Sequence, residues 1–325
     1  MRCLITGAAG FVGSHLAEEL IAQGNQVRCL VRQTSNLVWL KSLPVELARG
    51  DVLTPESLRS AVDGVEKVYH VAGLTRAFAE DDYVRVNAGG TGNLLEACLA
   101  SGGRLNRVVV VSSLSAAGPG APGRAICEDD PPRPLSRYGR SKLQAERVAA
   151  TFSDRLPISV VRPAAVYGPR DRDTLLLFEL ANWGLCPITW RQRVFSLIDV
   201  RDLARGLIAA GEGPCRAGRI YNLANPKSET LDRVTHMIAR SVGRRALTVR
   251  LPAAAFYASG AVRELAARAR GRPGIFDREK ARELAQPNWV CDTSRARDEL
   301  AFEARVPTEQ GICDAARWYR AAGWL

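Results

Sequence analysis

Short apolar runs alternate with longer amphipathic stretches over the first half of the chain. The apolar and β-branched runs predict strands at Cys3–Thr6, Gln26–Val31, Val45–Arg49, Lys67–His70, Val108–Val111 and Ser159–Arg162. Helical patterns lie between them at Gly13–Gln23, Pro55–Val62, Val84–Ser101 and Tyr138–Phe152. Strands that alternate with helices in this way indicate an α/β fold of the Rossmann type, a doubly wound parallel sheet.

After Pro163 the pattern becomes less regular. Helical stretches near Thr174–Trp183 and Val200–Ala210 alternate with short extended pieces at Phe195–Ile198 and Ile220–Asn222. From about Ser228 the chain holds helical segments rich in Ala and Arg. We therefore expect residues 1–165 to form the sheet domain, with later returns near 195–225, and residues 166–325 to form mainly a smaller substrate-binding cap.

Composition and charge narrow the function classes. Of the 325 residues 46% are hydrophobic and 24% charged, as in ordinary globular proteins. The net charge of +11 comes mostly from arginine, and we interpret it as spread over the surface. Aromatics make up only 6% of the chain, and basic residues do not interleave with them, which argues against a nucleic-acid partner.

The cysteines and the apolar runs bear on the compartment. Eight cysteines lie at irregular spacings without a CxxC pair, so we expect neither a disulfide framework nor a metal site. The chain enters its first strand at Cys3 with no signal peptide ahead of it, which predicts a cytoplasmic location. No apolar run approaches the roughly 20 residues that span a bilayer, so no membrane span is expected.

A glycine-rich turn joins the first predicted strand to the first helix. It reads TGAAGFVG, with Gly7, Gly10 and Gly13 at its turns and Phe11 and Val12 opening the helix. Glycines allow backbone N–H groups to approach a pyrophosphate closely, and the helix N-terminus adds its positive dipole end. Between a strand and a helix, this motif predicts a dinucleotide site in the 1–165 domain.

The end of the second strand bears on which dinucleotide binds. An acidic residue for the ribose 2′-hydroxyl often stands there, but this stretch has no carboxylate. Arg32 and Ser35 could instead hold a 2′-phosphate, so the sequence favours NADP over NAD, although a single arginine there could also be merely solvated. Asp51 and Val52 are placed at the adenine. Ala72 and Gly73 are placed beside the cofactor ribose, and we interpret His70 as a packing residue.

Tyr138 and Lys142 lie four residues apart and so share one face of a predicted helix. An adjacent ammonium lowers the pKa of a tyrosine, which could then move a proton to or from a substrate oxygen while hydride passes to or from the cofactor. Ser113 follows the fifth predicted strand and could polarise the same oxygen. These three residues predict the acid–base apparatus of a hydride-transfer enzyme.

With these motifs the chain resembles the extended short-chain dehydrogenase/reductase superfamily, the NAD-dependent epimerase/dehydratase type, over nearly its whole length. The matching segments are TGAAGFVG at 6–13, GDV at 50–52, VNAGGTGNLLEAC at 86–98, VSSLSAAG at 111–118, YGRSK at 138–142 and RPAAVYGPRD at 162–171. The resemblance implies that Ser113 is the catalytic serine, that Asn87 lies on the cofactor side and that Pro163 lines the nicotinamide. It also implies a homodimer joined through the helices at Val84–Ser101 and Tyr138–Phe152.

Three subclasses of this superfamily compete. Dehydratases carry Asp-Glu after the catalytic hydroxyl, whereas Leu114-Ser115 follow Ser113 here, so dehydration is set aside. Epimerases carry an asparagine where Ala165 stands and an arginine where Phe195 falls, although Arg191 or Arg193 could substitute after a small shift. The third subclass resembles 3β-hydroxysteroid dehydrogenases and dihydroflavonol reductases. Its likeness rests on VRCLVRQTSN at 27–36, SSLSAAGP at 112–119, YGPRD at 167–171 and WVCDTS at 289–294.

The cap sequence agrees with an apolar substrate. The runs 175–183 and 251–257 are strongly apolar and suit a pocket, although ordinary cap core explains them equally well. Arg263, Arg268, Arg270 and Arg272 follow the second run; they favour a solvated helix face, with contact to a membrane surface as the alternative.

The sequence thus predicts an NADP-preferring oxidoreductase that interconverts a secondary alcohol and a ketone on a largely apolar small molecule. An epimerase of nucleotide sugars with tightly bound NAD is the alternative. A non-catalytic dinucleotide sensor is a minor one, because sensors typically lose the tyrosine or the lysine that this chain keeps.

Overall fold

The computed structural model describes residues 1–102, 105–190, 192–213, 218–274 and 276–325, without the side chains of Thr189, Ala253 and Phe256. Its centre is a seven-stranded sheet in the order β11-β6-β5-β4-β1-β2-β3, in which every neighbouring pair is parallel. The strands are β1 (Arg2–Thr6), β2 (Gln26–Val31), β3 (Val45–Arg49), β4 (Lys67–His70), β5 (Arg107–Val111), β6 (Ile158–Pro163) and β11 (Arg219–Leu223). This confirms the predicted α/β Rossmann fold.

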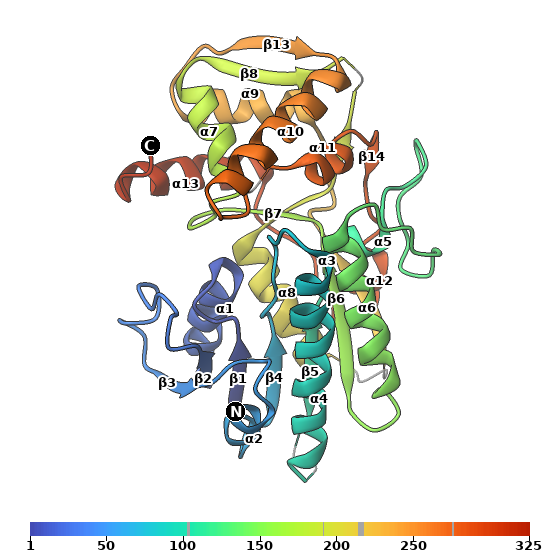
Figure 1. The fold of residues 1–325 in the computed structure, drawn as a ribbon. Helices are drawn as coiled ribbons and strands as arrows, with labels where there is room; N and C mark the ends of the chain where they lie inside the picture. The colour runs from blue at the N-terminus through green and yellow to red at the C-terminus, as the bar shows by residue number, and fades with distance from the viewer. Residues whose placement is uncertain (103–104, 191, 214–217, 275) are drawn as a thin grey trace.

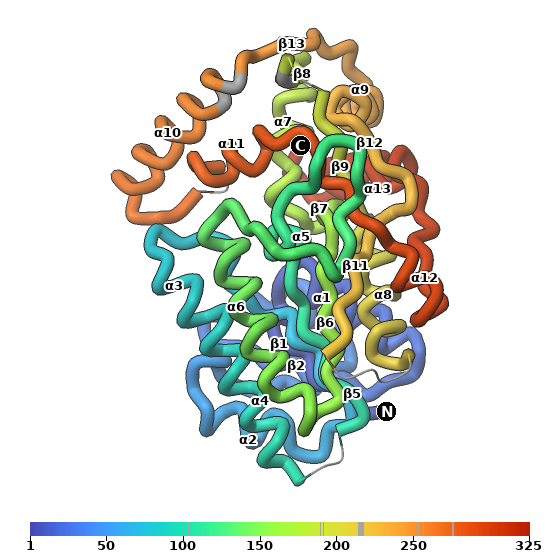
Figure 2. Tube along the Cα trace, turned by 90° about the vertical axis from the view of Figure 1, so that its right-hand side faces the viewer, coloured from blue at the N-terminus to red at the C-terminus, as the bar shows by residue number. Residues whose placement is uncertain are grey.

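Helices cover both faces of this sheet because its strands are apolar on both sides. In β1, Leu4 packs into the core on one face, while Cys3 and Ile5 pack into the core on the other. In Figure 2 the helices α2, α4 and α6 lie on one side of the sheet and α8 lies on the other. These elements are α1 (Phe11–Ala22), α2 (Pro55–Val62), α4 (Gly90–Ala100), α6 (Arg137–Thr151), α8 (Val200–Glu212) and α12 (Ser294–Leu300).

The strand order reverses between β1 and β4, which is where doubly wound sheets bind ligands. The segments that follow β1, β4 and β5 carry the glycine-rich turn, the Ala72-Gly73 pair and Ser113, in that order. Pro163 is the last residue of β6 and so lies at the same edge of the sheet. Short helices α3 (Glu80–Val84) and α5 (Leu114–Ala117) lie at this edge of the sheet.

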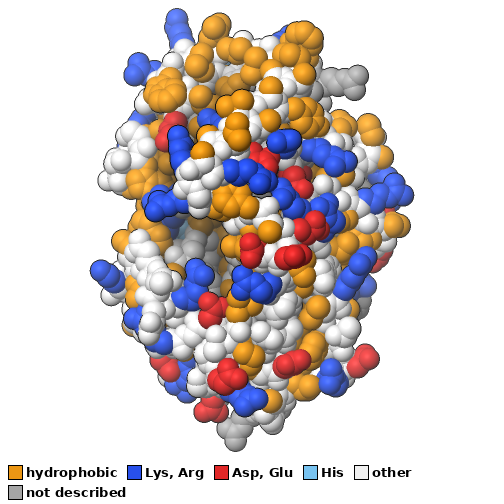
Figure 3. All heavy atoms as spheres, in the orientation of Figure 1, with side chains coloured by type: hydrophobic (Ala, Val, Ile, Leu, Met, Phe, Trp, Pro, Cys, Tyr) orange, Lys and Arg blue, Asp and Glu red, His pale blue; other side chains and the backbone are white. Residues whose placement is uncertain are grey.

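A cap covers this edge (Figure 1). It consists of α7 (Leu175–Asn182), β8 (Leu185–Thr189), α9 (Leu231–Ser241), β13 (Leu247–Leu251), α10 (Ala253–Ala269), α11 (Arg278–Leu284) and α13 (Thr308–Ala321). Two small sheets join the cap to the main domain: β7 (Ala165–Tyr167) with β10 (Leu197–Asp199), and β9 (Val194–Phe195) with β12 (Glu229–Thr230) and β14 (Asn288–Trp289). The surface is hollowed between cap and sheet domain (Figure 3).

Three predicted elements differ from the structure. The helix predicted over Val84–Ser101 is interrupted by a π-helical turn, η1, at Arg85–Gly89. The single extended piece predicted at Phe195–Ile198 forms two strands of different sheets, because β9 pairs with β12 while β10 pairs with β7. The tail predicted as helical also contains β13, which pairs with β8, some 60 residues earlier in the chain; that pairing is a long-range contact which local periodicity does not encode.

Candidate active site

The glycine-rich turn brings two loops together more closely than a side chain would allow. Gly7 has a φ of +74°, and a Cβ on it would lie 2.6 Å from the backbone N of Ala72. A Cβ on Gly13 would overlap the carbonyl of Gly7. Gly10 is the N-cap of α1 and has no side chain to bond the first N–H groups of the helix, and the first turn, which starts at Phe11 and Val12, has no acidic residue. This cradle fits a pyrophosphate on chemical grounds.

Two arginines lie at the carboxyl ends of β2 and β3, where the adenosine of a dinucleotide is predicted to bind. Arg32 is exposed just beyond β2, and its backbone N donates to the Ser35 hydroxyl at 3.0 Å. Arg49 ends β3 beside Val31, and its guanidinium reaches the carbonyl of Arg32 at 3.4 Å. Sequence reasoning missed Arg49, because only the parallel β2–β3 register places it next to Arg32.

Asp51 and Val52, which are predicted to contact the adenine, lie just after β3. Asp51 is half-buried, and its carboxylate accepts the N–H of Leu53 at 2.9 Å. Val52 is buried against Gly90, and its carbonyl accepts from Asn93 at 3.0 Å. Asp51 thus has its carboxylate at the edge of the sheet, whereas Val52 contributes packing.

Asn87 connects the loop after β4 with the helix that carries the catalytic pair. Its amide oxygen accepts from Leu74 N at 2.6 Å, and its amide nitrogen donates to Leu74 O at 3.0 Å and to Ser141 Oγ at 2.8 Å. Asn87 lies in the π-helical turn, and such turns are frequent at functional sites. A Cβ on Gly73 would lie 3.2 Å from Asn87 Oδ1 and 3.6 Å from Lys142 Nζ, so the loop passes directly over the lysine.

His70 is a packing residue, as the sequence suggests. Its Nδ1 lies 2.7 Å from Thr6 Oγ1, and its Nε2 lies 3.0 Å from Thr91 Oγ1. Because Thr91 donates its proton to the carbonyl of Asn87, Nε2 must be the donor and Nδ1 the acceptor. Burial lowers the pKa of His70 to about 3, so it stays neutral and holds β1 to β4.

The three predicted catalytic residues come together at the carboxyl end of β5. Tyr138 lies in the first turn of α6, which Ser136 caps by accepting the N–H of Gly139 at 3.0 Å. Lys142 is buried one turn later, and its Nζ donates to Val111 O at 2.6 Å. Ser113 is the N-cap of α5, where its hydroxyl accepts the N–H of Ser115 at 3.1 Å, and its side chain lies close enough to Tyr138 to lower the pKa of that phenol. A substrate oxygen at this hydroxyl pair would meet both side chains.

Burial dominates the protonation of this pair. It raises the pKa of Tyr138 well above the usual value, while the hydrogen bond with Ser113 lowers it and the charges of Glu283 and Asp173 raise it. The tyrosine is therefore a neutral phenol at neutral pH. The charge of Lys142 is not among the largest influences on the pKa of Tyr138. The lowering of this pKa by the lysine, which the sequence predicts, is therefore not seen here. Burial lowers the pKa of Lys142 to about 8, against the opposing effect of Glu146.

A buried ionic network lies beneath the catalytic residues. Arg162 binds Glu146 through Nε at 2.8 Å and Nη2 at 2.7 Å, and Ser112 donates to the same carboxylate. It joins α6, one turn past Lys142, to the ends of β5 and β6, where Pro163 is buried opposite Leu223 of β11. Sequence reasoning did not single out Glu146 or Arg162. The one available signal was Arg162, a charged residue inside an otherwise apolar strand, because Glu146 lies in a helix that holds several other charged residues.

Two cap residues that the sequence did not single out also reach the site. Glu283 of α11 accepts a hydrogen bond from Ser136, the N-cap of the tyrosine helix. Lys280 of α11 donates to the same carboxylate at 3.3 Å. On the sheet-domain side, Tyr83 packs edge-on against Tyr138 with ring centroids 6.3 Å apart.

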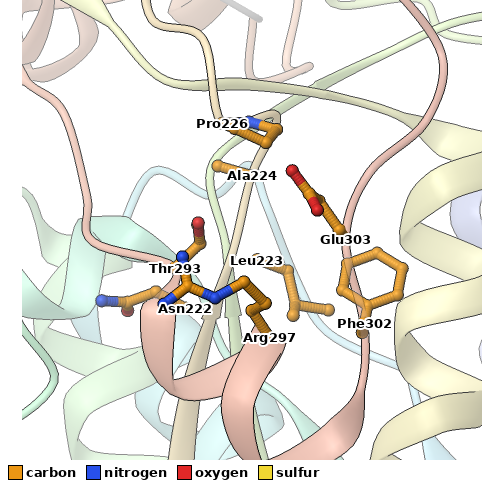
Figure 4. Close-up of a pocket in the computed structure, with 8 residues that line it drawn as sticks. All are labelled: Asn222, Leu223, Ala224, Pro226, Thr293, Arg297, Phe302 and Glu303. Carbon is orange, nitrogen blue, oxygen red and sulfur yellow. The ribbon is translucent and has the colours of Figure 1, made fainter.

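Other features lie apart from this site. A small pocket between the end of β11 and α12 contains Arg297 and Glu303 but none of the catalytic residues (Figure 4). Among the described residues no group of acidic, histidine and cysteine side chains could hold a metal ion. None of the described helices is both long and apolar enough to cross a membrane. Arg191, one of the two substitutes considered for the epimerase arginine, lies outside the described residues.

Comparison with known proteins agrees with this geometry. Residues 3–224 match the model of the NAD dependent epimerase/dehydratase family. The chain is 32% identical to a ceramide reductase of Caulobacter vibrioides, over 99% of this chain and 95% of the relative. It is 29% identical to a 2-alkyl-3-oxoalkanoate reductase of Shewanella oneidensis, over 96% of this chain and 84% of the relative.

A solved structure places the fold in the same group. MoeE5 in complex with UDP-glucuronic acid and NAD is 28% identical, with a TM-score of 0.78 over 99% of this chain and 100% of that one. The glycine cradle, the assembled tyrosine, lysine and serine, and the family match over most of the chain agree with one another. The chain belongs to the NAD dependent epimerase/dehydratase family, as an NAD(P)-dependent enzyme of the extended short-chain dehydrogenase/reductase type.

Proposed function

We propose that the protein reduces a ketone on a largely apolar substrate to a secondary alcohol, and catalyses the reverse oxidation, with NADP as the preferred cofactor. The observation that carries this proposal is the placing of the Ser113 side chain next to a neutral Tyr138 at the end of β5, beside an apolar wall. Phe195 forms part of this wall in one cluster with Leu114 and Ala117, where an epimerase would carry an arginine. The names of the two relatives, reductases of a ceramide and of an alkyl-oxoalkanoate, support the same substrate class.

The residues divide the chemistry between them. A bound nicotinamide dinucleotide supplies the hydride in the reduction, held by the Gly7–Gly13 turn and the loop at Ala72 and Gly73. Tyr138 donates its phenolic proton to the ketone oxygen, and its raised pKa keeps that proton in place at neutral pH. Ser113 donates a hydrogen bond to the same oxygen and stabilises the charge that develops on it. Lys142, with a pKa of about 8, carries its positive charge beside them.

The proposal is tested by cofactor exchange and turnover of the purified enzyme. We expect dinucleotide to dissociate on dialysis and NADPH to be oxidised when long-chain ketones are added. NAD that stays bound through purification, together with turnover of UDP-sugars, would replace this proposal with the epimerase alternative, which the MoeE5 complex keeps open.

The preference for NADP leads to a prediction about Arg32. The exposed Arg32, with Arg49 beside it and no carboxylate at the end of β2, suits a 2′-phosphate. Arg32→Ala is expected to weaken NADPH binding by about tenfold or more and to leave NADH binding unchanged, because only the phosphate loses a charged partner. Fluorescence titration of the stripped protein measures both affinities.

Arg59→Ala is the matched control for this change, because Arg59 is equally exposed but lies on α2. Tighter binding of NADH than of NADPH by the wild-type protein would contradict the NADP preference, and an unchanged NADPH/NADH ratio in the Arg32 variant would remove Arg32 from the site.

Three further statements stay predictions. The homodimer would use α4 and α6, whose outward residues include Glu96, Gln144 and Arg147; light scattering would measure it. A cytoplasmic location is predicted from the sequence alone.

Association of the cap with a membrane surface is compatible with its exposed apolar residues, such as Trp183, Val262 and Leu265. Figure 3 shows apolar side chains gathered at this end of the molecule. Liposome co-sedimentation would measure this association.

A further inference from the structure

Arg193 is a buried cation for which the protein supplies no counterion. It is 4% exposed, and its Nε is enclosed without a hydrogen-bond partner. Within the described parts of the chain its side chain forms no hydrogen bond and no ion pair. The residues outside those parts, at 103–104, 191, 214–217 and 275, include no Asp or Glu, so they cannot supply a carboxylate either.

The strand geometry places Arg193 on the catalytic side of the cap. Side chains alternate along a strand, so Arg193 shares the face of Phe195 in β9. Phe195 packs in one cluster with Leu114, which follows the catalytic Ser113, and with Leu284 of α11. Figure 2 shows β9 next to β12, with which it pairs, and the N–H of Leu231 donates to the carbonyl of Arg193, so this pairing continues to Arg193.

The helix α11 connects this face to the reacting atoms. Glu283, next to Leu284, bonds Ser136 at the start of α6, and its charge acts on Tyr138. Arg193 therefore lies within the walls of the substrate region, with no carboxylate paired to it. Among the described residues, Tyr257 of α10 is the one titratable group that affects the pKa of Arg193, and burial lowers this pKa.

An enclosed charge without a partner costs folding free energy, and this cost is removed when a counterion binds. We propose that the ketone substrate carries an anionic group, a carboxylate or a phosphate, and that Arg193 binds it while the apolar chain lies along the wall at Phe195. This inference rests on the proposed function and narrows its substrate to lipophilic acids.

The test uses anionic and neutral inhibitors of the same chain length. Turnover of a neutral long-chain ketone with NADPH is measured in the presence of dodecanoate, dodecyl phosphate or dodecanol. We expect at least one of the two anions to inhibit about tenfold more strongly than dodecanol, in line with a hydrogen bond between charged groups. The stronger anion then identifies the carboxylate or the phosphate as the natural group.

Arg193→Met should abolish this difference and leave inhibition by dodecanol unchanged. Because methionine replaces a cation that has no partner, we expect the variant to melt no lower than the wild type. The effective anion should raise the Tm of the wild type and not that of the variant, which is a readout independent of turnover. Arg240→Met is the control, because Arg240 lies in the same cap but is 67% exposed and paired with Glu309.

The outcomes separate the two proposals. If no ketone is turned over but the anion still raises Tm only when Arg193 is present, the proposed reaction fails and the anion site stands. If ketones are turned over and dodecanol inhibits as well as both anions, or if the Arg193 variant behaves like the wild type, the anion site is wrong. A lower Tm for the Arg193 variant with unchanged anion binding would show a structural role. If UDP-glucose is the one compound that inhibits, and its inhibition is lost in the Arg193→Met variant, lipophilic acids are the wrong substrate class.

Discussion

Replacing Tyr138 by phenylalanine will lower kcat for ketone reduction by about 10²–10⁴-fold, the range that a positioned general acid contributes. In the proposed mechanism the phenolic proton is the one that reaches the substrate oxygen, and Ser113 only hydrogen-bonds that oxygen. The ring of Tyr138 packs against Tyr83 with or without its hydroxyl, so Tm and NADPH affinity should not change. Steady-state kinetics, fluorescence titration and thermal melting measure the three quantities.

Tyr83→Phe is the matched control for this prediction. It removes a hydroxyl from the neighbouring ring, where the hydroxyl donates to Thr75 O at 3.4 Å and interacts with the backbone of Ala77, and kcat should change less than about threefold. Equal losses in the two variants would mean that the pair acts through packing. Unchanged biological activity of the Tyr138 variant would instead revive the non-catalytic dinucleotide sensor.

The sheet was predictable from the sequence because its information is local. All six strands predicted in the first half agree with the structure to within one residue at each end, since each is an apolar run between turns, as at Gln26–Val31 and Lys67–His70. The glycine turn and the Tyr138–Lys142 pair are equally local, as their spacing along the chain fixes their spacing in space. Motifs of this kind identify a site without knowledge of the tertiary structure.

The rest of the site depends on contacts between distant segments. Glu283 meets Ser136 across 147 residues, and β9 takes its place only by pairing with β12 and β14. The π-helical turn at Asn87 adds one residue to a helical turn so that its amide can reach both Leu74 and Ser141. Neither hydrophobic periodicity nor a short motif carries such information, which is why the contact of Glu283 with the site was not predicted.

Glu146→Ala is expected to lower the free energy of unfolding by about 3–5 kcal/mol, because it leaves the Arg162 guanidinium buried without its carboxylate. Both side chains are almost fully enclosed, at 3% and 5% exposed, so water cannot take the place of the lost partner. Ser112 loses its acceptor at the same time. Thermal and denaturant melting measure the loss.

Loss of the Glu146 carboxylate should also change the pKa of Lys142. The Glu146 carboxylate favours the charged form of Lys142, whose pKa burial lowers to about 8. Without Glu146 this pKa falls further, so Lys142 loses its proton at a lower pH. The alkaline limb of the kcat profile should therefore move to lower pH in any Glu146 variant that folds, such as Glu146→Gln.

Two controls decide whether burial causes the destabilisation. Arg140 holds Glu80 in the same two-bonded geometry, but these side chains are 42% and 43% exposed, so Glu80→Ala should cost about 1 kcal/mol or less. The double variant Glu146→Leu/Arg162→Met removes both buried charges and should regain most of the stability. If Glu146→Ala costs no more than Glu80→Ala, the buried pair is not what holds the catalytic helix to β5 and β6. If the double variant is as unstable as the single one, the stabilisation comes from shape and hydrogen bonding around Ser112 rather than from charge.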